Sequence, residues 1–201
     1  MGQRLVVTIE RKGHHLAKLY FHWSAYTGDA LYVSRDIVHC IYNHKDETDR
    51  DMLLRLIRFC EERGGCIDGR ENGEEVRYIS QLYPNEKFKE TGSRSDGLIA
   101  LSPEGMADMQ RWSEGDVYID LDEDVIDFCV YSGYESLAEY IAERKSWDDE
   151  FEEFTLDEIP RVSYELGYIN VNDIDALIEE FEHTDDNQNV IMFGNEIVEL
   201  I

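Results

Sequence analysis

Positive charge is almost missing from the second half of this chain. Residues 101–201 contain only 4 Lys and Arg beside 29 Asp and Glu, whereas residues 1–100 contain 15 and 16. Nearly all of the net charge of −26 therefore belongs to the second half. Such a field repels nucleic acid and anionic membranes, so we expect no direct binding to either. The asymmetry favours a strongly basic partner.

Proline and long apolar runs are also scarce. The chain has only 3 Pro and no Ser/Gly-rich linker, but it has 12 Tyr, 8 Phe and 42% hydrophobic residues, too many for a disordered acidic tail. No apolar run approaches the roughly 20 residues of a membrane span. The N-terminus has no signal-peptide core. We therefore expect a folded cytoplasmic protein that carries its acidity on a structured surface.

Cysteine is limited to four residues without a paired framework, which is typical of reduced, buried thiols. Zinc binding is an alternative, because Cys40 and His44 lie four residues apart and Cys60 and Cys66 could add two ligands. The order C-x3-H…C-x5-C is irregular, and Cys60 lies on the apolar stripe of a predicted helix. We expect neither a metal nor another cofactor.

The common catalytic motifs are absent: no GxSxG, P-loop, GxGxxG or HExxH sequence occurs. The segment Asp120–Asp124 resembles the start of a calcium-binding loop. However, Val125 replaces the glycine at the sixth position, and Tyr131 replaces the bidentate glutamate at the twelfth. This excludes an EF-hand, and the sequence favours a binding protein over an enzyme.

Hydrophobic periodicity predicts an α+β fold of antiparallel β-hairpins packed with amphipathic helices. We place a soft boundary at residue 132, between an α+β scaffold lobe (1–131) and an acidic helical lobe with a terminal β-hairpin (132–201); a single domain is the alternative. The expected hairpins pair 5–9 with 15–23, 117–121 with 125–131, and 190–193 with 197–201. The expected helices cover 27–42, 48–63, 76–83, 134–147 and 173–181, with a strand at 98–101 and another helix from Ser102.

Acidic residues recur at spacings that present carboxylates in rows. Residues two apart on a strand share a face at about 6.6 Å, and residues four apart on a helix are neighbours. Asp175 and Glu179 have the helical spacing. Such rows suit a basic nucleic-acid-binding groove, although a plain solvated face remains the alternative. The residues that we expect to contact a partner are Asp120, Asp122, Asp124, Glu135, Glu139, Glu143, Asp148, Asp149 and Glu152.

A second candidate site lies in the first half. Arg4, Tyr20 and His22 fall on the polar face of the first hairpin, close to a predicted helix start, and Asp96 could join them. Arginine, tyrosine and histidine there could bind a phosphate or carboxylate, and imidazole titrates near neutral pH. The sequence therefore allows a small-ligand or nucleotide-binding protein, or a hydrolase. The simpler interpretation is a structural cluster that joins the hairpin to the first helix.

The opening Met1–Leu5 (MGQRL) and the segment Tyr20–Thr27 (YFHWSAYT) resemble the start of a group of proteins from Firmicutes and their phages and mobile elements. The later Asp96–Ile99 segment fits the same pattern. The resemblance covers about the first two-thirds of the chain and carries no activity for any residue. It implies a mobile-element protein in a bacterial cytoplasm, where small acidic proteins act as anti-CRISPR or anti-restriction inhibitors. The partner it implies is a CRISPR effector or another nuclease.

Overall fold

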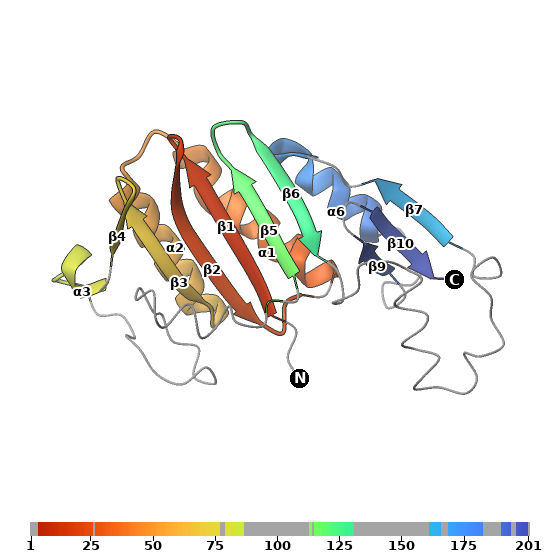
Figure 1. Ribbon diagram of the computed structural model, residues 1–201, viewed down its shortest axis with the longest axis horizontal. Coiled ribbons are helices and arrows are strands. Elements are labelled where there is room, and N and C mark those ends of the chain that lie inside the picture. Colours follow the sequence, from red (N-terminus) through yellow and green to blue (C-terminus); the bar gives the residue numbers. More distant parts are fainter. Residues whose placement is uncertain are drawn as a thin grey trace.

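The chain forms a seven-stranded sheet with helices on one face, and a separate three-stranded sheet (Figure 1). The computed structural model describes residues 4–25, 27–76, 79–86, 113, 115–130, 161–165, 169–182, 190–193 and 196–200. The strands are β1 (Arg4–Arg11), β2 (His14–His22), β3 (Cys66–Glu71), β4 (Glu74–Val76), β5 (Gly115–Asp120), β6 (Val125–Val130), β7 (Arg161–Glu165), β8 (Ile169–Asn170), β9 (Val190–Phe193) and β10 (Glu196–Leu200). The helices are α1 (Thr27–Ile41), α2 (Asp49–Arg63), α3 (Ile79–Leu82) and α6 (Ile174–Glu182), with 3-10 turns at Tyr42–His44 and Val171–Asp173.

The larger sheet is mixed, with the strand order β4-β3-β2-β1-β5-β6-β8. The α+β class is therefore confirmed, and β1–β2, β5–β6 and β9–β10 are antiparallel pairs as predicted. The expectation of hairpins alone is wrong, because β1 and β5 pair in parallel, with Val7 opposite Val117. Alternation identifies a strand and its buried face, but it does not specify which strand lies beside it or in which direction.

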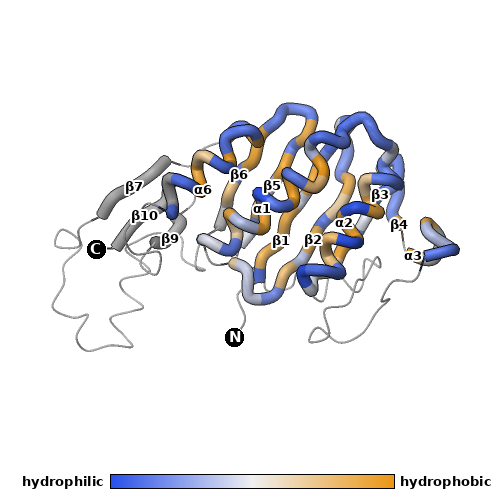
Figure 2. Tube along the Cα trace, turned by 180° about the vertical axis from the view of Figure 1, so that it is seen from behind, coloured by the Kyte–Doolittle hydropathy of each residue, from blue (hydrophilic) through white to orange (hydrophobic). Residues whose placement is uncertain are grey.

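Helices α1 and α2 cover one face of this sheet, and their apolar sides turn toward it (Figure 2). The apolar stripes of the two helices, which were predicted at 27–42 and 48–63, are buried in the core. In α2, Thr48 caps the first turn by accepting the N–H of Asp51, and Gly64 ends the helix at φ +71°. The buried stripe residues are Leu31, Ile37, Val38, Ile41, Met52, Leu53, Leu56, Ile57 and Cys60.

The hairpin of β3 and β4 is an element that the sequence analysis did not predict. Its turn is Asn72-Gly73, where both residues have positive φ, at +52° and +81°. An Asn-Gly pair between short strands is a strong hairpin signal, although the charged residues around it hide the strand pattern. The expected short helix in 76–83 is observed as α3, whereas the strand at 98–101 and the helices from 102 and over 134–147 lie outside the described residues.

Part of the expected acidic lobe belongs to the core of the first half. Strand β8 pairs with β6, and α6 packs against α1. Val171, Ile174 and Ile178 join the same hydrophobic cluster as the residues of β1 and α1. Residues on the two sides of the soft boundary at residue 132 are therefore in contact, through β6 with β8 and α1 with α6. The three-stranded sheet, in the order β7-β10-β9, contains the predicted terminal hairpin.

Candidate functional site

Helix α6 presents a row of carboxylates that we call the α6 stripe: Asp175, Glu179 and Glu182. The spacings of four and three residues place them on one face of the helix, and all three are exposed. The adjacent face of the helix carries Ile174 and Ile178, which are buried in the core. The predicted row of Asp175 and Glu179 thus lies on a helix whose backbone is held by the core, with no Lys or Arg between residues 169 and 182.

Helix α1 contacts the α6 stripe at both ends. The Tyr32 hydroxyl donates to Glu182 Oε1 at 2.8 Å, and His39 Nε2 lies 2.9 Å from Asp175 Oδ2. Partial burial and the Glu182 carboxylate raise the pKa of Tyr32. These contacts fix the orientation of the outer carboxylates. The phenol of Tyr32 does so without supplying a positive charge.

The acids at Asp120, Asp122 and Asp124 do not form a row on a strand face. Strand β5 ends at Asp120, and residues 121–124 form the turn to β6. Asp120 Oδ1 accepts the N–H groups of Asp122 and Glu123, at 2.8 and 3.1 Å. Asp122 Oδ2 accepts the Gly13 N–H at 2.8 Å, and Asp124 pairs with Lys45. These three carboxylates therefore hold turns of the sheet together.

Backbone hydrogen bonds explain the electrostatics of this turn. The N–H groups of Gly13 and then Lys12 lower the pKa of Asp122. Lys12 and Gly13 both have positive φ, at +51° and +66°, which turns successive N–H groups toward the carboxylate. The turn of the first hairpin thus binds a carboxylate of the second hairpin, 109 residues away.

A buried ion pair lies at the same end of the sheet. Arg11 Nη1 is 3.2 Å from Asp49 Oδ1, with side chains 2% and 3% exposed. Arg11 also donates to the Glu47 carbonyl oxygen at 2.8 Å. Asp49 Oδ2 lies 3.0 Å from His14 Nε2 and accepts the Asn72 N–H at 2.9 Å. The pair therefore joins the β1–β2 turn, the link between α1 and α2, and the β3–β4 turn.

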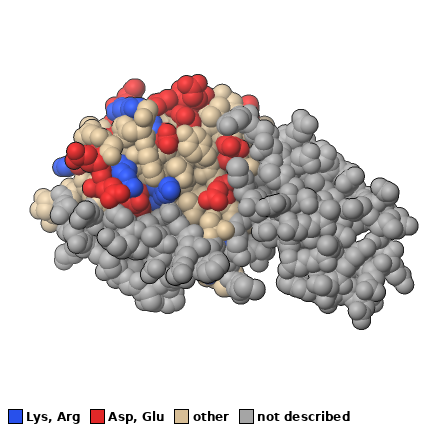
Figure 3. Space-filling view, viewed as in Figure 1, with Lys and Arg blue, Asp and Glu red and all other residues tan. Residues whose placement is uncertain are grey.

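Three residues of the second predicted site lie on one face of β1 and β2. The Tyr20 hydroxyl is 2.8 Å from His22 Nδ1, and Arg4 is opposite His22 in the register. Tyr20 is only 3% exposed and forms a small buried cluster with Val6 and Cys66. Figure 3 shows this face of the sheet. Lys and Arg lie toward β3 and β4, and Asp and Glu occur over both halves of the sheet. The fourth predicted residue, Asp96, lies outside the described residues.

Trp23 follows directly after these residues and is 54% exposed. The strand predicted over 15–23 ends one residue earlier, at His22, and Trp23 has φ +69°. Its ring lies edge-on to the ring of His22, with centroids 4.9 Å apart and planes at 79°. Among the described residues it is the one exposed large hydrophobic side chain. Sequence alternation continues through Trp23 and carries no sign of this change of direction.

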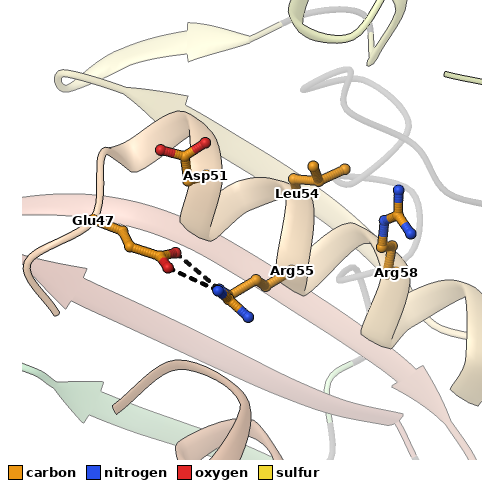
Figure 4. A pocket seen from close by; sticks show the side chains of 5 residues that line it. All are labelled: Glu47, Asp51, Leu54, Arg55 and Arg58. Atoms are coloured by element: carbon orange, nitrogen blue, oxygen red, sulfur yellow. Dashed lines mark hydrogen bonds and ion pairs between the residues drawn. The ribbon is translucent and has the colours of Figure 1, made fainter. Parts of the chain in front are cut away.

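A shallow pocket of about 350 Å³ lies along the outer face of α2 (Figure 4). Arg55 forms a two-point pair with Glu47, at 2.8 and 2.7 Å, which lowers the pKa of Glu47 to about 2. Arg58 and Asp51 lie at opposite ends of the group, with Leu54 between them. Two acids and two bases leave the lining electrically balanced, so it favours neither anions nor cations.

The zinc hypothesis finds no support in the positions of the cysteines. Cys60 is fully buried and its Sγ lies 3.8 Å from the Cys66 carbonyl oxygen, while His44 Nδ1 lies 3.0 Å from Glu47. Burial raises the pKa of Cys60, and raises that of Cys66 to about 11. Across the described ranges no three His, Cys, Asp or Glu side chains are placed to hold a metal ion.

Several predicted contact residues lie outside the described ranges: Glu135, Glu139, Glu143, Asp148, Asp149 and Glu152. A scan of protein-family models, a search of curated proteins and a search of solved structures each find no match to the chain. In the described part of the chain, no helix is long and apolar enough to cross a membrane.

Proposed function

We propose that the chain is an inhibitory binding protein of the bacterial cytoplasm, encoded by a phage or mobile element. Its acidic surface occupies a basic groove on a nucleic-acid-handling protein, such as a CRISPR effector or another nuclease, and excludes nucleic acid from that groove. The observation that carries this proposal is the segregation of charge, with 29 acids and 4 bases in residues 101–201. Solvation alone does not require charge to be segregated in this way.

The geometry of α6 supports the proposal. Its carboxylates are neighbours on one helical face, at about 5–6 Å between Cβ atoms for each pair. The helix is anchored by Ile174 and Ile178, so little conformational entropy is lost when a partner binds this face. A regular row of fixed negative charges resembles the phosphates of a nucleic-acid backbone, which are what a basic groove ordinarily binds.

Electrostatic steering gives the proposal a kinetic consequence. Complementary charge accelerates association, and salt weakens it because the Debye length falls to about 8 Å at physiological ionic strength. We therefore expect capture of a partner from a bacterial lysate at low salt and its release at high salt. The captured protein, once purified, is assayed for binding of a labelled DNA duplex and RNA in the presence of the chain. Competition for the nucleic acid is the result that the proposal requires.

Two charge-matched variants assign the effect to α6. The test variant is Asp175→Asn, Glu179→Gln, Glu182→Gln. The control variant is Asp46→Asn, Glu62→Gln, Glu74→Gln, which removes three exposed acids from the first half. We expect the test variant to weaken inhibition more than the control does. Equal effects would reduce the role of α6 to bulk charge, and a captured partner that still binds nucleic acid freely would contradict the proposal.

The small-ligand hypothesis is retained on one observation, the Tyr20 hydroxyl 2.8 Å from His22 Nδ1 with Arg4 in register beside it. A ligand there would be a phosphate or carboxylate. Titration of the chain with inorganic phosphate, followed by NMR of the His22 ring, tests it, with His22→Gln in calorimetry as the control. An unchanged His22 spectrum at millimolar phosphate would rule out this ligand class.

A further inference from the structure

Trp23 has a backbone conformation that its side chain disfavours. Left-handed φ is uncommon outside glycine, asparagine and aspartate, and it is a genuine outlier for a bulky residue. Trp23 nevertheless adopts φ +69° and remains 54% exposed. Strained residues persist only where the surrounding structure determines them, and they gather at functional sites. The local packing therefore directs a large apolar ring toward solvent.

The ring of Trp23 is supported from the sheet. The His22 ring meets it edge-on, and His22 Nδ1 lies 2.8 Å from the hydroxyl of the buried Tyr20. His22 is the last residue of β2 and pairs with Arg4 of β1, whereas the pairing of β2 with β3 ends two residues earlier, at Tyr20. Trp23 is consequently an aromatic surface on a rigid support, which limits the entropy lost when another molecule packs on it.

The charge of the protein favours some ligands of an exposed indole over others. Flat aromatic surfaces stack on nucleobases or accept cations on their faces. The net charge of −26, nearly all of it in residues 101–201, attracts a basic partner at long range and repels the phosphates that accompany nucleobases. Tryptophan is the strongest cation–π acceptor among the side chains, and it is enriched among residues that dominate binding energy at interfaces.

Trp23 and the Glu182 end of the α6 stripe are both connected to the first two turns of α1. Helix α1 begins at Thr27, four residues beyond Trp23. Tyr32, which bonds to Glu182, lies five residues into that helix, or about 7.5 Å along its axis.

We propose that Trp23 is an anchor for an arginine or lysine side chain of the basic partner, bound over the indole face. This inference rests on the proposed function and adds a specific contact to it. The acids of the α6 stripe supply long-range attraction, and Trp23 supplies a short-range contact that is insensitive to salt. A chain that lacks the ring should still attract the partner but hold it less tightly.

The test uses a fluorescently labelled peptide of nine arginines and the full chain. The variants are Trp23→Phe, which keeps an aromatic face, and Trp23→Leu, which keeps apolar bulk alone. Tyr42→Leu is the matched control, because the Lys45 ammonium already lies 4.7 Å from the centre of that ring. Affinity is measured by fluorescence anisotropy over a series of salt concentrations. Circular dichroism and urea midpoints establish folding, and Trp23→Gly, which accommodates positive φ, replaces Trp23→Leu if that variant unfolds.

We expect Trp23→Leu to weaken peptide binding by about two- to fivefold, the range of an exposed cation–π contact, with Trp23→Phe between it and the wild type. Tyr42→Leu should bind as the wild type does. The salt dependence should keep the same slope in Trp23→Leu, because no charge is removed. Salt-dependent binding that is unaffected by Trp23→Leu, or that Phe and Leu change equally, overturns this inference and leaves the proposed function standing. A wild-type chain that does not bind the peptide overturns both.

Discussion

Two groups of carboxylates in this molecule have the same chemistry and opposite surroundings. At one end of the larger sheet, Asp49, Asp122 and Asp124 bind N–H groups or basic side chains that lie far away in the sequence. On α6, Asp175 and Glu182 are exposed, and their partners from α1 are a histidine and a phenol. The carboxylates of the first group join turns through hydrogen bonds and ion pairs, whereas those of the second group face solvent.

The comparison shows that acidic composition alone does not locate a binding surface. Asp120, Asp122 and Asp124 lie within five residues of one another, but their oxygens accept N–H groups or pair with Lys45. A partner would compete with those contacts. The α6 stripe has an anchored backbone and exposed charges, which is the combination that an interface needs. Removing acids from the two groups should therefore have opposite consequences for stability and for binding.

The largest effect on stability is expected for Asp49→Asn. The substitution leaves Arg11 as a buried cation, 2% exposed, without its counter-ion. Breaking a buried pair in this way costs about 3–5 kcal/mol of unfolding free energy. Urea denaturation followed by circular dichroism measures the loss. The α6 triple variant serves as the comparison, since it removes more charge from the chain.

A second substitution sharpens the result for Asp49. Arg11→Met together with Asp49→Leu removes both charges and fills the site with apolar side chains. We expect this double variant to be more stable than Asp49→Asn, because no ion is left buried without a partner. A loss below about 1 kcal/mol in Asp49→Asn would show that the buried pair contributes little, and would remove the contrast with α6.

Low pH should lower the unfolding free energy by protonating Asp49 and Asp122 at this end of the sheet. Backbone N–H groups lower the pKa of Asp122, and for Asp49 the Asn72 N–H, His14 and Arg11 outweigh the burial that acts to raise it. A carboxyl whose pKa is lower in the folded state stabilises the fold fully above its ordinary value of 3.8. That contribution is lost as the pH falls through the folded value. We therefore expect Asp122→Asn to be less stable than the wild type at pH 6, by a difference that shrinks as the pH falls below 3.8.

Unfolding free energies of both proteins at pH 6, 4, 3 and 2 measure this convergence. The sign follows from linkage: the unfolded chain binds the proton more tightly than the folded chain does, so acid favours unfolding. Curves that remain parallel down to pH 2 would mean that the Gly13 hydrogen bond does not favour the charged form of Asp122.

A smaller effect on stability is expected from the α6 triple variant, Asp175→Asn, Glu179→Gln, Glu182→Gln. Exposed ion pairs and surface substitutions change stability by about 0.5 kcal/mol or less, and loss of like charge partly offsets the lost contacts. Urea denaturation at low and high salt checks this. A loss as large as that of Asp49→Asn would place the α6 stripe among the structural carboxylates and remove it as a candidate binding surface.

The sequence was informative where local chemistry determines structure. The cap at Thr48, the glycine at Gly64 and the apolar stripe of α2 predicted that helix to within one residue. The turns at Lys12-Gly13 and Asp122–Asp124 marked two hairpins. In each case a few neighbouring residues contain the physical reason for the element.

The remaining features depend on contacts between distant residues, so the sequence pattern does not specify them. Parallel pairing of β1 with β5, the Gly13 bond to Asp122 and the Arg11–Asp49 pair each join segments that periodicity treats separately. The exposure of Trp23 depends on a single backbone angle. The row on α6 and the shared face of Arg4, Tyr20 and His22 were predictable, because helical spacing and strand alternation are both local.

We expect the smallest effect on stability at Glu47. This residue also gives the sharpest test of how an ion pair changes the pKa of a carboxyl group. Its side chain is on the surface, yet hydrogen bonds from Arg55 lower its pKa to about 2. In Arg55→Gln the carboxyl should titrate close to the ordinary value of 4.5, followed by NMR of the Glu47 side-chain carbon. Glu62, which is exposed on the helix that carries Arg55, provides an internal control in the same spectra. If Glu47 titrates alike in the wild type and in Arg55→Gln, the two-point pair does not hold in solution. If only the pKa of Glu47 changes, one guanidinium is enough to hold a surface carboxylate in an ion pair within the fold. Each acid paired in this way then contributes less charge to a partner than a count of acids in the sequence suggests.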